Sequence, residues 1–220
     1  ASTLGAAIAL SKMKEDLNGT IVVIGTPAEE TTGGKCELVE KGAFADIDGA
    51  IQMHLGAENN INVVTLAMDS MEFNFKGLAS HAAAYPEKGI NALDGVQLMF
   101  AGVNALRQHM RSDARVAGIV CDGGVACNIV PDKASCRFYI RAKDRSYLEE
   151  LTQKIINCAK GAALMCGAEL EYHYFENSYD DMKYDESLRT LLKQNLMDLG
   201  ITSFVESDEE ASGSSDIGNV

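Results

Sequence analysis

The sequence has no tryptophan, and aromatic residues make up only 6% of its 220 residues. Aromatic platforms on which bases or sugars stack are therefore scarce. Basic residues are also few, with 19 Lys and Arg against 32 Asp and Glu, so the formal net charge is −13. Because nucleic acids and anionic membranes would repel such a chain, we expect neither as a partner.

Membrane and export signals are missing as well. No apolar run approaches the roughly 20 residues that span a bilayer. The first residues, Ala1 to Leu4, have neither the basic n-region nor the apolar h-region of a signal peptide. The six cysteines form no C-x-x-C pair and no dense disulfide framework. Reduced thiols in a cytoplasmic protein are the simplest explanation.

Two adjacent carboxylates follow a short apolar run near the start of the chain. The β-branched residues 21–24 predict a buried parallel strand, which the turn at 25–27 ends. In open α/β sheets ligands bind beyond the carboxyl ends of strands, where Glu29 and Glu30 would lie. One carboxylate could bind a cation while the other faces a water molecule. Alternatively, both only complement the dipole of the helix that follows Gly33.

A histidine follows at the end of the next predicted strand. After a helix at 2–16, the strand at 21–24 and a helix at 35–44, residues 50–56 predict a second buried strand that carries His54. Two strands joined by one helix are parallel and end on the same side of the sheet, so Glu30 and His54 could share one cation. A lone histidine is more often structural, but the paired carboxylates upstream favour a ligand.

The middle of the chain has the pattern of a separate domain. Its predicted elements are a strand at 63–76, a helix at 90–110, strands at 115–121 and 133–141, a helix at 147–166 and a strand at 169–175. This is the order of the ferredoxin-like fold. A helix at 182–199 and a strand at 201–205 then return to the first domain. We predict an α/β chain divided at 1–61, 62–177 and 178–220, with the middle part inserted.

Three residues of the inserted domain are candidates for a site. His81 lies in a loop of small residues that would leave it accessible, although it could instead bond to backbone. Asn128 follows a glycine-marked bend and could serve turn chemistry alone. Arg141 belongs to the predicted open face of its strand, where a guanidinium can hold a carboxylate or simply remain solvated.

Together these segments resemble the M20 family of metal-dependent peptidases and amidohydrolases, in particular its aminoacylase-like and aminobenzoyl-glutamate hydrolase-like branch. The resemblance rests on Thr26–Glu30, the strand end at His54, Gly77–Pro86 with Gly89–Leu93, Gly123–Pro131 and Gly213–Asp216. It implies a metal-dependent exopeptidase-like catalytic domain with an inserted ferredoxin-like domain that serves as lid and dimerisation domain.

The resemblance also implies catalytic and metal-binding roles. Glu29 matches the general base that takes a proton from the attacking water. Glu30 and His54 match ligands of one or two divalent ions, with zinc as the first choice and manganese or cobalt as alternatives. His81 matches a lid histidine that reaches into the site of the partner subunit and stabilises the oxyanion.

Substrate contacts follow from the same resemblance. Asn128 matches a polar companion of the lid histidine, and Arg141 matches the group that holds the substrate carboxylate. Gly213 and Ser214 match the loop that lines the substrate pocket. The implied reaction is hydrolysis of an amide next to a free carboxylate, as in N-acyl amino acids, dipeptides or aminobenzoyl-glutamate, by a homodimer.

Part of the family's metal site does not occur in this sequence. The family supplies a Gly-Cys-Gly-His type segment and an aspartate before the position of Ala1, and another histidine beyond Val220. Two protein ligands are too few for a catalytic zinc, which usually has three and an open position. We therefore expect these residues to be the middle of a longer enzyme and inactive alone. The alternatives are a non-catalytic binding or dimerisation module with an incomplete metal site, and a carboxypeptidase acting on longer peptides.

Overall fold

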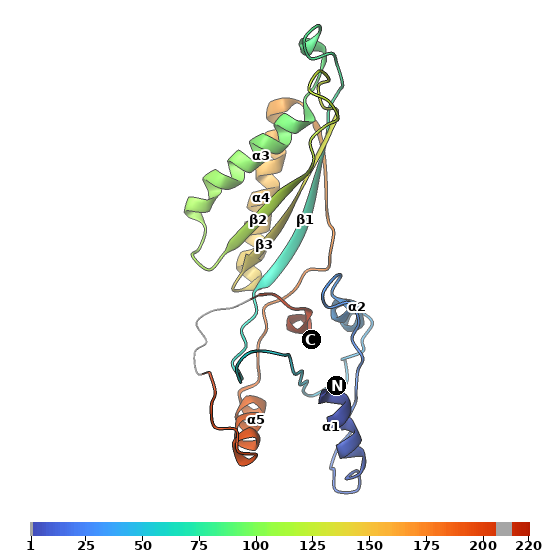
Figure 1. Ribbon diagram of the computed structural model, residues 1–220, viewed down its shortest axis with the longest axis vertical. Coiled ribbons are helices and arrows are strands. Elements are labelled where there is room, and N and C mark those ends of the chain that lie inside the picture. Colours follow the sequence, from blue (N-terminus) through green and yellow to red (C-terminus); the bar gives the residue numbers. More distant parts are fainter. Residues whose placement is uncertain (1, 206–212) are drawn as a thin grey trace.

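The computed structural model describes residues 2–205 and 213–220. Its best-packed part is an antiparallel sheet with two helices on one face (Figure 1). The elements of this part are β1 (Ala67–Lys76), α3 (Ala92–Leu106), β2 (Arg115–Asp122), β3 (Lys133–Ala142), α4 (Arg145–Cys166) and β4 (Glu169–Tyr174). The strands lie in the order β2-β3-β1-β4. This order and the chain sequence of elements confirm the predicted ferredoxin-like fold of the middle domain, which we call the lid.

The lid core follows from alternation along the strands and helical periodicity in the helices. Side chains with at most 2% exposure include Met71, Phe73, Phe75, Val96, Met99, Val103, Cys136, Phe138, Ile140, Leu148, Leu151 and Ile155. On β3, Cys136, Phe138 and Ile140 face the helices, while Arg137 and Arg141 belong to the open face, as predicted. Only glycine fits at position 118 of β2, because a Cβ there would lie 2.4 Å from the Phe138 ring.

The other helices pack more loosely. They are α1 (Ser2–Ser11), α2 (Gly34–Glu40) and α5 (Glu186–Asp198), with single turns η1 (Pro86–Lys88), η2 (Arg107–His109) and η3 (Asp216–Asn219). The helices predicted at 2–16, 35–44 and 182–199 are therefore present in shorter form. Neither α1 nor α5 has a fully buried residue. No described helix is both long and apolar enough to cross a lipid bilayer.

Three predicted strands are not formed in the described part of the chain. Residues 21–24 and 50–56 have no strand assignment, and within 201–205 only Val205 makes a parallel bridge, to Asn60. The prediction of two buried parallel strands on either side of α2 is therefore wrong for the described residues. Ile21 is 57% exposed and Met53 66% exposed. The apolar runs are present, but a strand exists only through backbone bonds to a neighbour, and the described residues supply none here.

Two chain segments connect the lid to the rest of the molecule. They meet at an antiparallel bridge in which the backbone of Met68 and Tyr179 exchanges two hydrogen bonds, both 2.9 Å long. The side chains of these two residues form a small buried cluster with Cys36 of α2, and Tyr139 of β3 packs against it. The N-terminal and C-terminal segments therefore meet the open face of the sheet at its lower end (Figure 1).

Candidate functional site

The two adjacent carboxylates lie in a tight loop before α2. Ala28 has a φ of 59°, a left-handed conformation that is uncommon for a residue with a side chain. The amide of Gly33 donates to the Ala28 carbonyl over 2.9 Å and closes the loop. Glu29 is half-buried whereas Glu30 is exposed. The two carboxylates thus occupy different environments.

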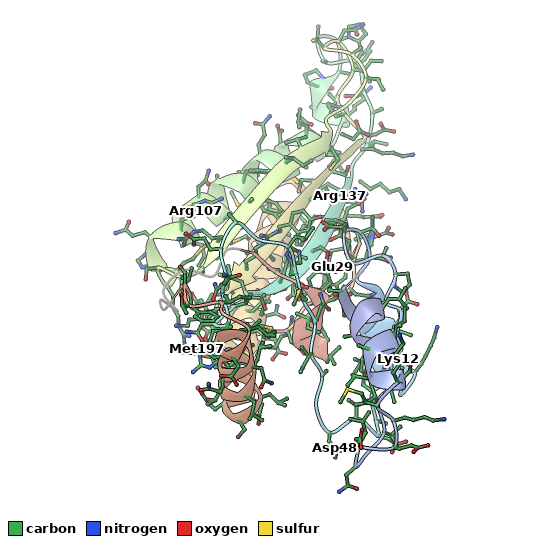
Figure 2. The ribbon with its side chains drawn as sticks, turned by 60° about the horizontal axis from the view of Figure 1, so that its bottom comes forward. Lys12, Glu29, Asp48, Arg107, Arg137 and Met197 are labelled. Carbon is green, nitrogen blue, oxygen red and sulfur yellow. The ribbon has the colours of Figure 1, made fainter. Side chains whose placement is uncertain are left out.

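Glu29 is held from two sides where the N-terminal part meets the sheet (Figure 2). The hydroxyl of Ser215 donates to Glu29 Oε1 over 2.7 Å, and the hydroxyl of Tyr179 donates to the Glu29 backbone oxygen over 3.3 Å. Burial raises the pKa of Tyr179, which is 4% exposed, so its hydroxyl keeps the proton that it donates. Oε2 of Glu29 has no hydrogen-bond partner among the described residues.

A buried ion pair adjoins Ser215. Lys35 Nζ lies 2.6 Å from Asp216 Oδ1, with side chains 3% and 0% exposed. Sequence reasoning missed Lys35, Tyr179, Ser215 and Asp216. The segment Gly213–Asp216 carries the signal for two of them, because Ser215 and Asp216 directly follow the expected pocket residues Gly213 and Ser214.

Glu30 and His54 suit a divalent ion chemically but do not complete a site. His54 is exposed, and its Nδ1 lies 2.8 Å from the Leu55 carbonyl oxygen. If Nδ1 donates this bond, Nε2 keeps a lone pair for a metal. Within residues 2–205 and 213–220, no three His, Cys, Asp or Glu side chains form a group that could hold an ion. The ligand type therefore fits, but two ligands are fewer than a catalytic zinc needs.

His81 and Asn128 come together at the tip of the lid. The Ala82 amide donates to the Asn128 carbonyl over 3.0 Å, and His81 bridges to Ile129. His81 Nδ1 accepts from the amides of Ala83 and Ala84 at 3.3 and 3.2 Å. A ring that accepts at Nδ1 carries its proton on Nε2, which is the form an oxyanion donor needs. The backbone contact expected as the alternative is thus present, and it leaves the Nε2–H group available.

Arg141 lies at the opposite end of the sheet from the tip. It pairs with Met68 in the register of β1 and β3, and its guanidinium is 5.6 Å from the centre of the Tyr139 ring. Tyr139 packs on the small cluster that includes Tyr179, whose hydroxyl bonds to Glu29. Arg141 forms no ion pair within the part of the chain that the structure describes. A cation without a carboxylate partner therefore lies at the same end of the sheet as Glu29.

The loop before η3 is described from Gly213 onward. The Gly213 carbonyl accepts from the Leu66 amide over 2.8 Å, which fixes the loop to the segment that enters the lid. The hydroxyl of Ser214 is buried and has no hydrogen-bond partner among the described residues. The substrate contact expected for Ser214 stays a prediction, because this hydroxyl is buried among the described residues.

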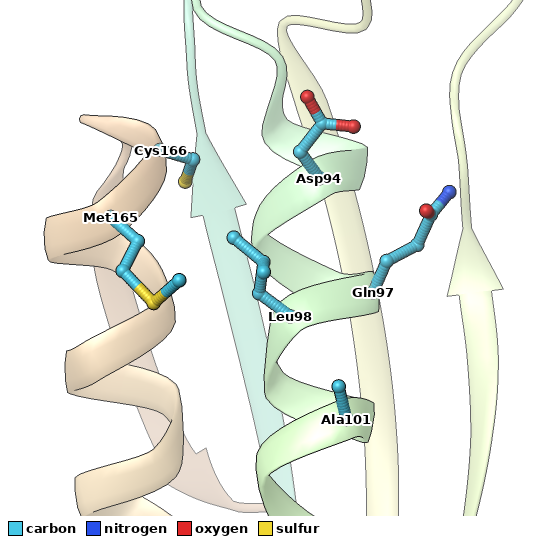
Figure 3. A pocket seen from close by; sticks show the side chains of 6 residues that line it. All are labelled: Asp94, Gln97, Leu98, Ala101, Met165 and Cys166. Carbon is cyan, nitrogen blue, oxygen red and sulfur yellow. The ribbon is translucent and has the colours of Figure 1, made fainter.

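A hollow of about 510 Å³ lies elsewhere, between α3 and α4 (Figure 3). Its lining consists of Asp94, Gln97, Leu98, Ala101, Met165 and Cys166. None of the predicted site residues contributes to it. The carboxylates and the unpaired arginine lie instead at the lower end of the sheet, and we place the candidate site there.

Known proteins resemble both the lid and the whole chain. The sequence profile of the M20 "Peptidase dimerisation domain" matches residues 66–164. The Xaa-Arg dipeptidase of Mus musculus is 36% identical over 100% of the chain, and a p-aminobenzoyl-glutamate hydrolase subunit of Escherichia coli (strain K12) is 34% identical over 90%. The chain covers 52% and 42% of these two proteins. It thus spans about half the length of the curated relatives it matches.

Solved structures show the same fold. An aminobenzoyl-glutamate utilization protein from Klebsiella pneumoniae superposes with a TM-score of 0.79 at 24% identity, over 99% of the chain and 57% of that protein. A dinuclear metal-binding peptidase of the M20 family from Bacillus subtilis superposes with a TM-score of 0.69 at 19% identity, over 99% and 57%. With the lid profile and the sequence relatives, these folds establish that the chain belongs to the M20 family of peptidases and amidohydrolases.

Proposed function

We propose that the protein hydrolyses an amide bond next to a free carboxylate, in an N-acyl amino acid, a dipeptide or an aminobenzoyl-glutamate type substrate. One observation carries the proposal: Glu29 is half-buried and fixed by a hydrogen bond, while its neighbour Glu30 is exposed. This is the separation that a general base and a metal ligand require. The similarity to an Xaa-Arg dipeptidase and to an aminobenzoyl-glutamate hydrolase supports the same reaction class.

Each site residue then has one role. Glu29 takes a proton from the attacking water at its free Oε2 and returns it to the leaving nitrogen. His81, supplied by the partner subunit, donates from Nε2 to the oxyanion, with Asn128 beside it. Arg141 binds the substrate carboxylate, because a guanidinium can hold both carboxylate oxygens at once. Gly213 and Ser214 line the pocket.

Glu30 and His54 would hold the metal, with zinc as the first choice and manganese or cobalt as alternatives. Bound there, a divalent ion would supply Lewis-acid chemistry, activating water and polarising the carbonyl of the substrate. The described residues provide two of the ligands, so we propose that the remaining ligands belong to other parts of the full-length protein.

We propose that the protein works as a cytoplasmic homodimer. The match of residues 66–164 to a dimerisation domain supports a dimer through the inserted lid. The domain boundaries that we propose are those of the sequence pattern, with the lid at 62–177. We propose neither nucleic acids nor anionic membranes as partners, because the net charge of −13 would repel both.

The general base can be tested by Glu29→Gln in the full-length protein. The amide keeps the shape and the Ser215 contact of Glu29 but cannot accept a proton at neutral pH. We expect turnover to fall at least a hundred-fold, in line with the usual contribution of a positioned base, with metal content unchanged. The measurement is hydrolysis of a panel of acyl-amino acids, dipeptides and longer peptides with added zinc, manganese or cobalt, together with metal analysis.

Glu37→Gln is the matched control. Glu37 is an exposed carboxylate on α2, and the same substitution there should leave turnover unchanged. Activity of Glu29→Gln within a few-fold of the wild type would reject Glu29 as the base.

A further inference from the structure

The C-terminal segment 213–220 is fastened to three other parts of the molecule. The Gly213 carbonyl accepts from Leu66, and Asn219 bonds to the backbone on both sides of Tyr179, donating to Ser178 O and accepting from Asp180 N, each at 3.2 Å. Asp216 forms the third anchor, to α2. Ser215 therefore lies between anchored residues, with Gly213 on one side and Asp216 and Asn219 on the other.

Asp216 is anchored through both of its carboxylate oxygens by one residue. The backbone amide of Lys35 donates to Oδ2 over 2.9 Å, and its ammonium donates to Oδ1 over 2.6 Å. Two bonds from one residue fix the rotation of the carboxylate as well as its position. Both side chains are almost fully buried, so water does not compete for these bonds.

The anchored residue lies directly next to the one that contacts Glu29. Ser215 Oγ donates to Glu29 Oε1 over 2.7 Å, and this is the one side-chain hydrogen bond that Glu29 makes to described residues. Without it, the carboxylate could rotate about its terminal torsion, which is broad and roughly two-fold. The ammonium of Lys35 also neutralises Asp216, so the segment brings no unpaired negative charge close to Glu29.

We propose that Ser215 is a positioning residue that sets the orientation of the Glu29 carboxylate, and that the buried Lys35–Asp216 pair holds Ser215 in place. The proposal rests on the proposed function, in which Glu29 is the general base. Ser215 does not contact the reacting atoms. It selects the orientation in which Oε2 of Glu29 is free to take the proton.

Steady-state kinetics of serine variants in the full-length protein test whether Ser215 positions Glu29. Ser215→Ala should lower kcat roughly ten- to hundred-fold, as expected for a lost hydrogen bond to a charged group, and leave KM within two-fold. Ser215→Thr keeps the hydroxyl and should recover kcat to within about three-fold. The control is Ser146→Ala, which removes a hydroxyl bonded to Asp144 Oδ1 at the same 2.7 Å on the lid and should change neither constant.

Whether the Lys35–Asp216 pair holds Ser215 in place is tested by Asp216→Asn, alone and combined with Ser215→Ala. If Asp216 acts through Ser215, the double variant should be little slower than Ser215→Ala alone, because the two changes remove one shared effect. In the metal-free protein, Asp216→Asn should also accelerate amide hydrogen exchange across residues 213–220, whereas Ser146→Ala should not.

The outcomes separate the two proposals. Unchanged kcat in Ser215→Ala, a rise in KM alone, or equal losses in Ser215→Ala and Ser215→Thr would overturn the positioning role. Unchanged exchange in Asp216→Asn, or fully additive losses, would overturn the role of the ion pair. If Glu29→Gln stays active, the base assignment fails, whereas hydrogen exchange in metal-free protein still reports on the anchoring independently of turnover.

Discussion

Lys35 and Asp216 are charged side chains that the fold keeps out of water. Lys35→Met removes the ammonium and leaves Asp216 Oδ1 buried without its donor, which typically costs about 3–5 kcal/mol for a broken buried pair. We expect the apparent unfolding temperature of the protein to fall by several degrees. A thermal melt followed by circular dichroism measures the change.

Lys41→Met serves as the comparison, because Lys41 directly follows α2 and forms an exposed pair with Glu37 of that helix, with 3.8 Å between their charged atoms. Exposed ion pairs contribute about 0–1 kcal/mol to the free energy of unfolding, so this variant should unfold at nearly the same temperature as the wild type. Equal decreases in the two variants would contradict a special role for burial.

Only those features of the site that depend on neighbouring residues could be predicted from the sequence. Two neighbouring carboxylates after an apolar run predicted that one binds a cation while the other faces a water molecule. The structure shows Glu29 half-buried and Glu30 exposed, and their two roles stay a prediction. The Lys35–Asp216 pair was not predictable in this way. Lysine and aspartate are rarely fully buried, and these two are 181 positions apart.

The lid elements were predicted to within a few residues because each carries its own periodic pattern. The strand predicted at 133–141 is observed as Lys133–Ala142, and the helix predicted at 147–166 as Arg145–Cys166. The runs at 21–24 and 50–56 carry a strand pattern too, but the described residues offer them no ladder partner. Pairing is a non-local property, and composition alone does not supply it.

The C-terminal boundary of the lid can be tested, because contacts extend beyond residue 177. Asp69, fully buried on β1, accepts from Arg145, Thr152 and Ser178, each at 2.7 Å. The main apolar core lies between Ala67 and Leu170, so residues 62–177 should fold alone. A segment of residues 62–182 should be more stable, because it adds the Ser178 hydroxyl and the backbone bonds between Met68 and Tyr179.

Urea unfolding of the two segments, followed by circular dichroism, measures the difference. We expect a gain of about 1–3 kcal/mol for the longer segment, the usual cost of leaving buried polar groups unpaired. Ser178→Ala in the longer segment should remove part of that gain. Equal transition midpoints for the two segments would place the boundary at 177.

The fold places the two candidate catalytic residues, His81 and Glu29, far apart within one chain. The loops that carry His81 and Asn128 form the tip of the lid. The helix α2 lies near the opposite end of the sheet (Figure 1), where the hydroxyl of Tyr179 also reaches Glu29. Arg141, in contrast, lies on the open face near the Glu29 end. No local sequence pattern reports this separation, since it depends on the direction in which β1 and β3 leave the junction. It favours a site in which His81 comes from a second copy of the chain.

Mixing two inactive variants of the full-length protein tests that arrangement. His81→Ala should lose roughly 2.7–4 kcal/mol of transition-state stabilisation, the usual value for one oxyanion donor, and Glu29→Gln lacks the base. In a mixed dimer, the His81→Ala subunit keeps Glu29 and receives His81 from the Glu29→Gln subunit, so one of its two sites is intact. With random exchange of equal amounts, half of the dimers are mixed, and activity should return to about a quarter of the wild type. Hydrolysis rates before and after dissociation and reassembly measure the recovery, and two wild-type preparations mixed in the same way control for losses. If mixed dimers form, as shown by differently tagged subunits purifying together, and activity does not recover, His81 does not act across the dimer.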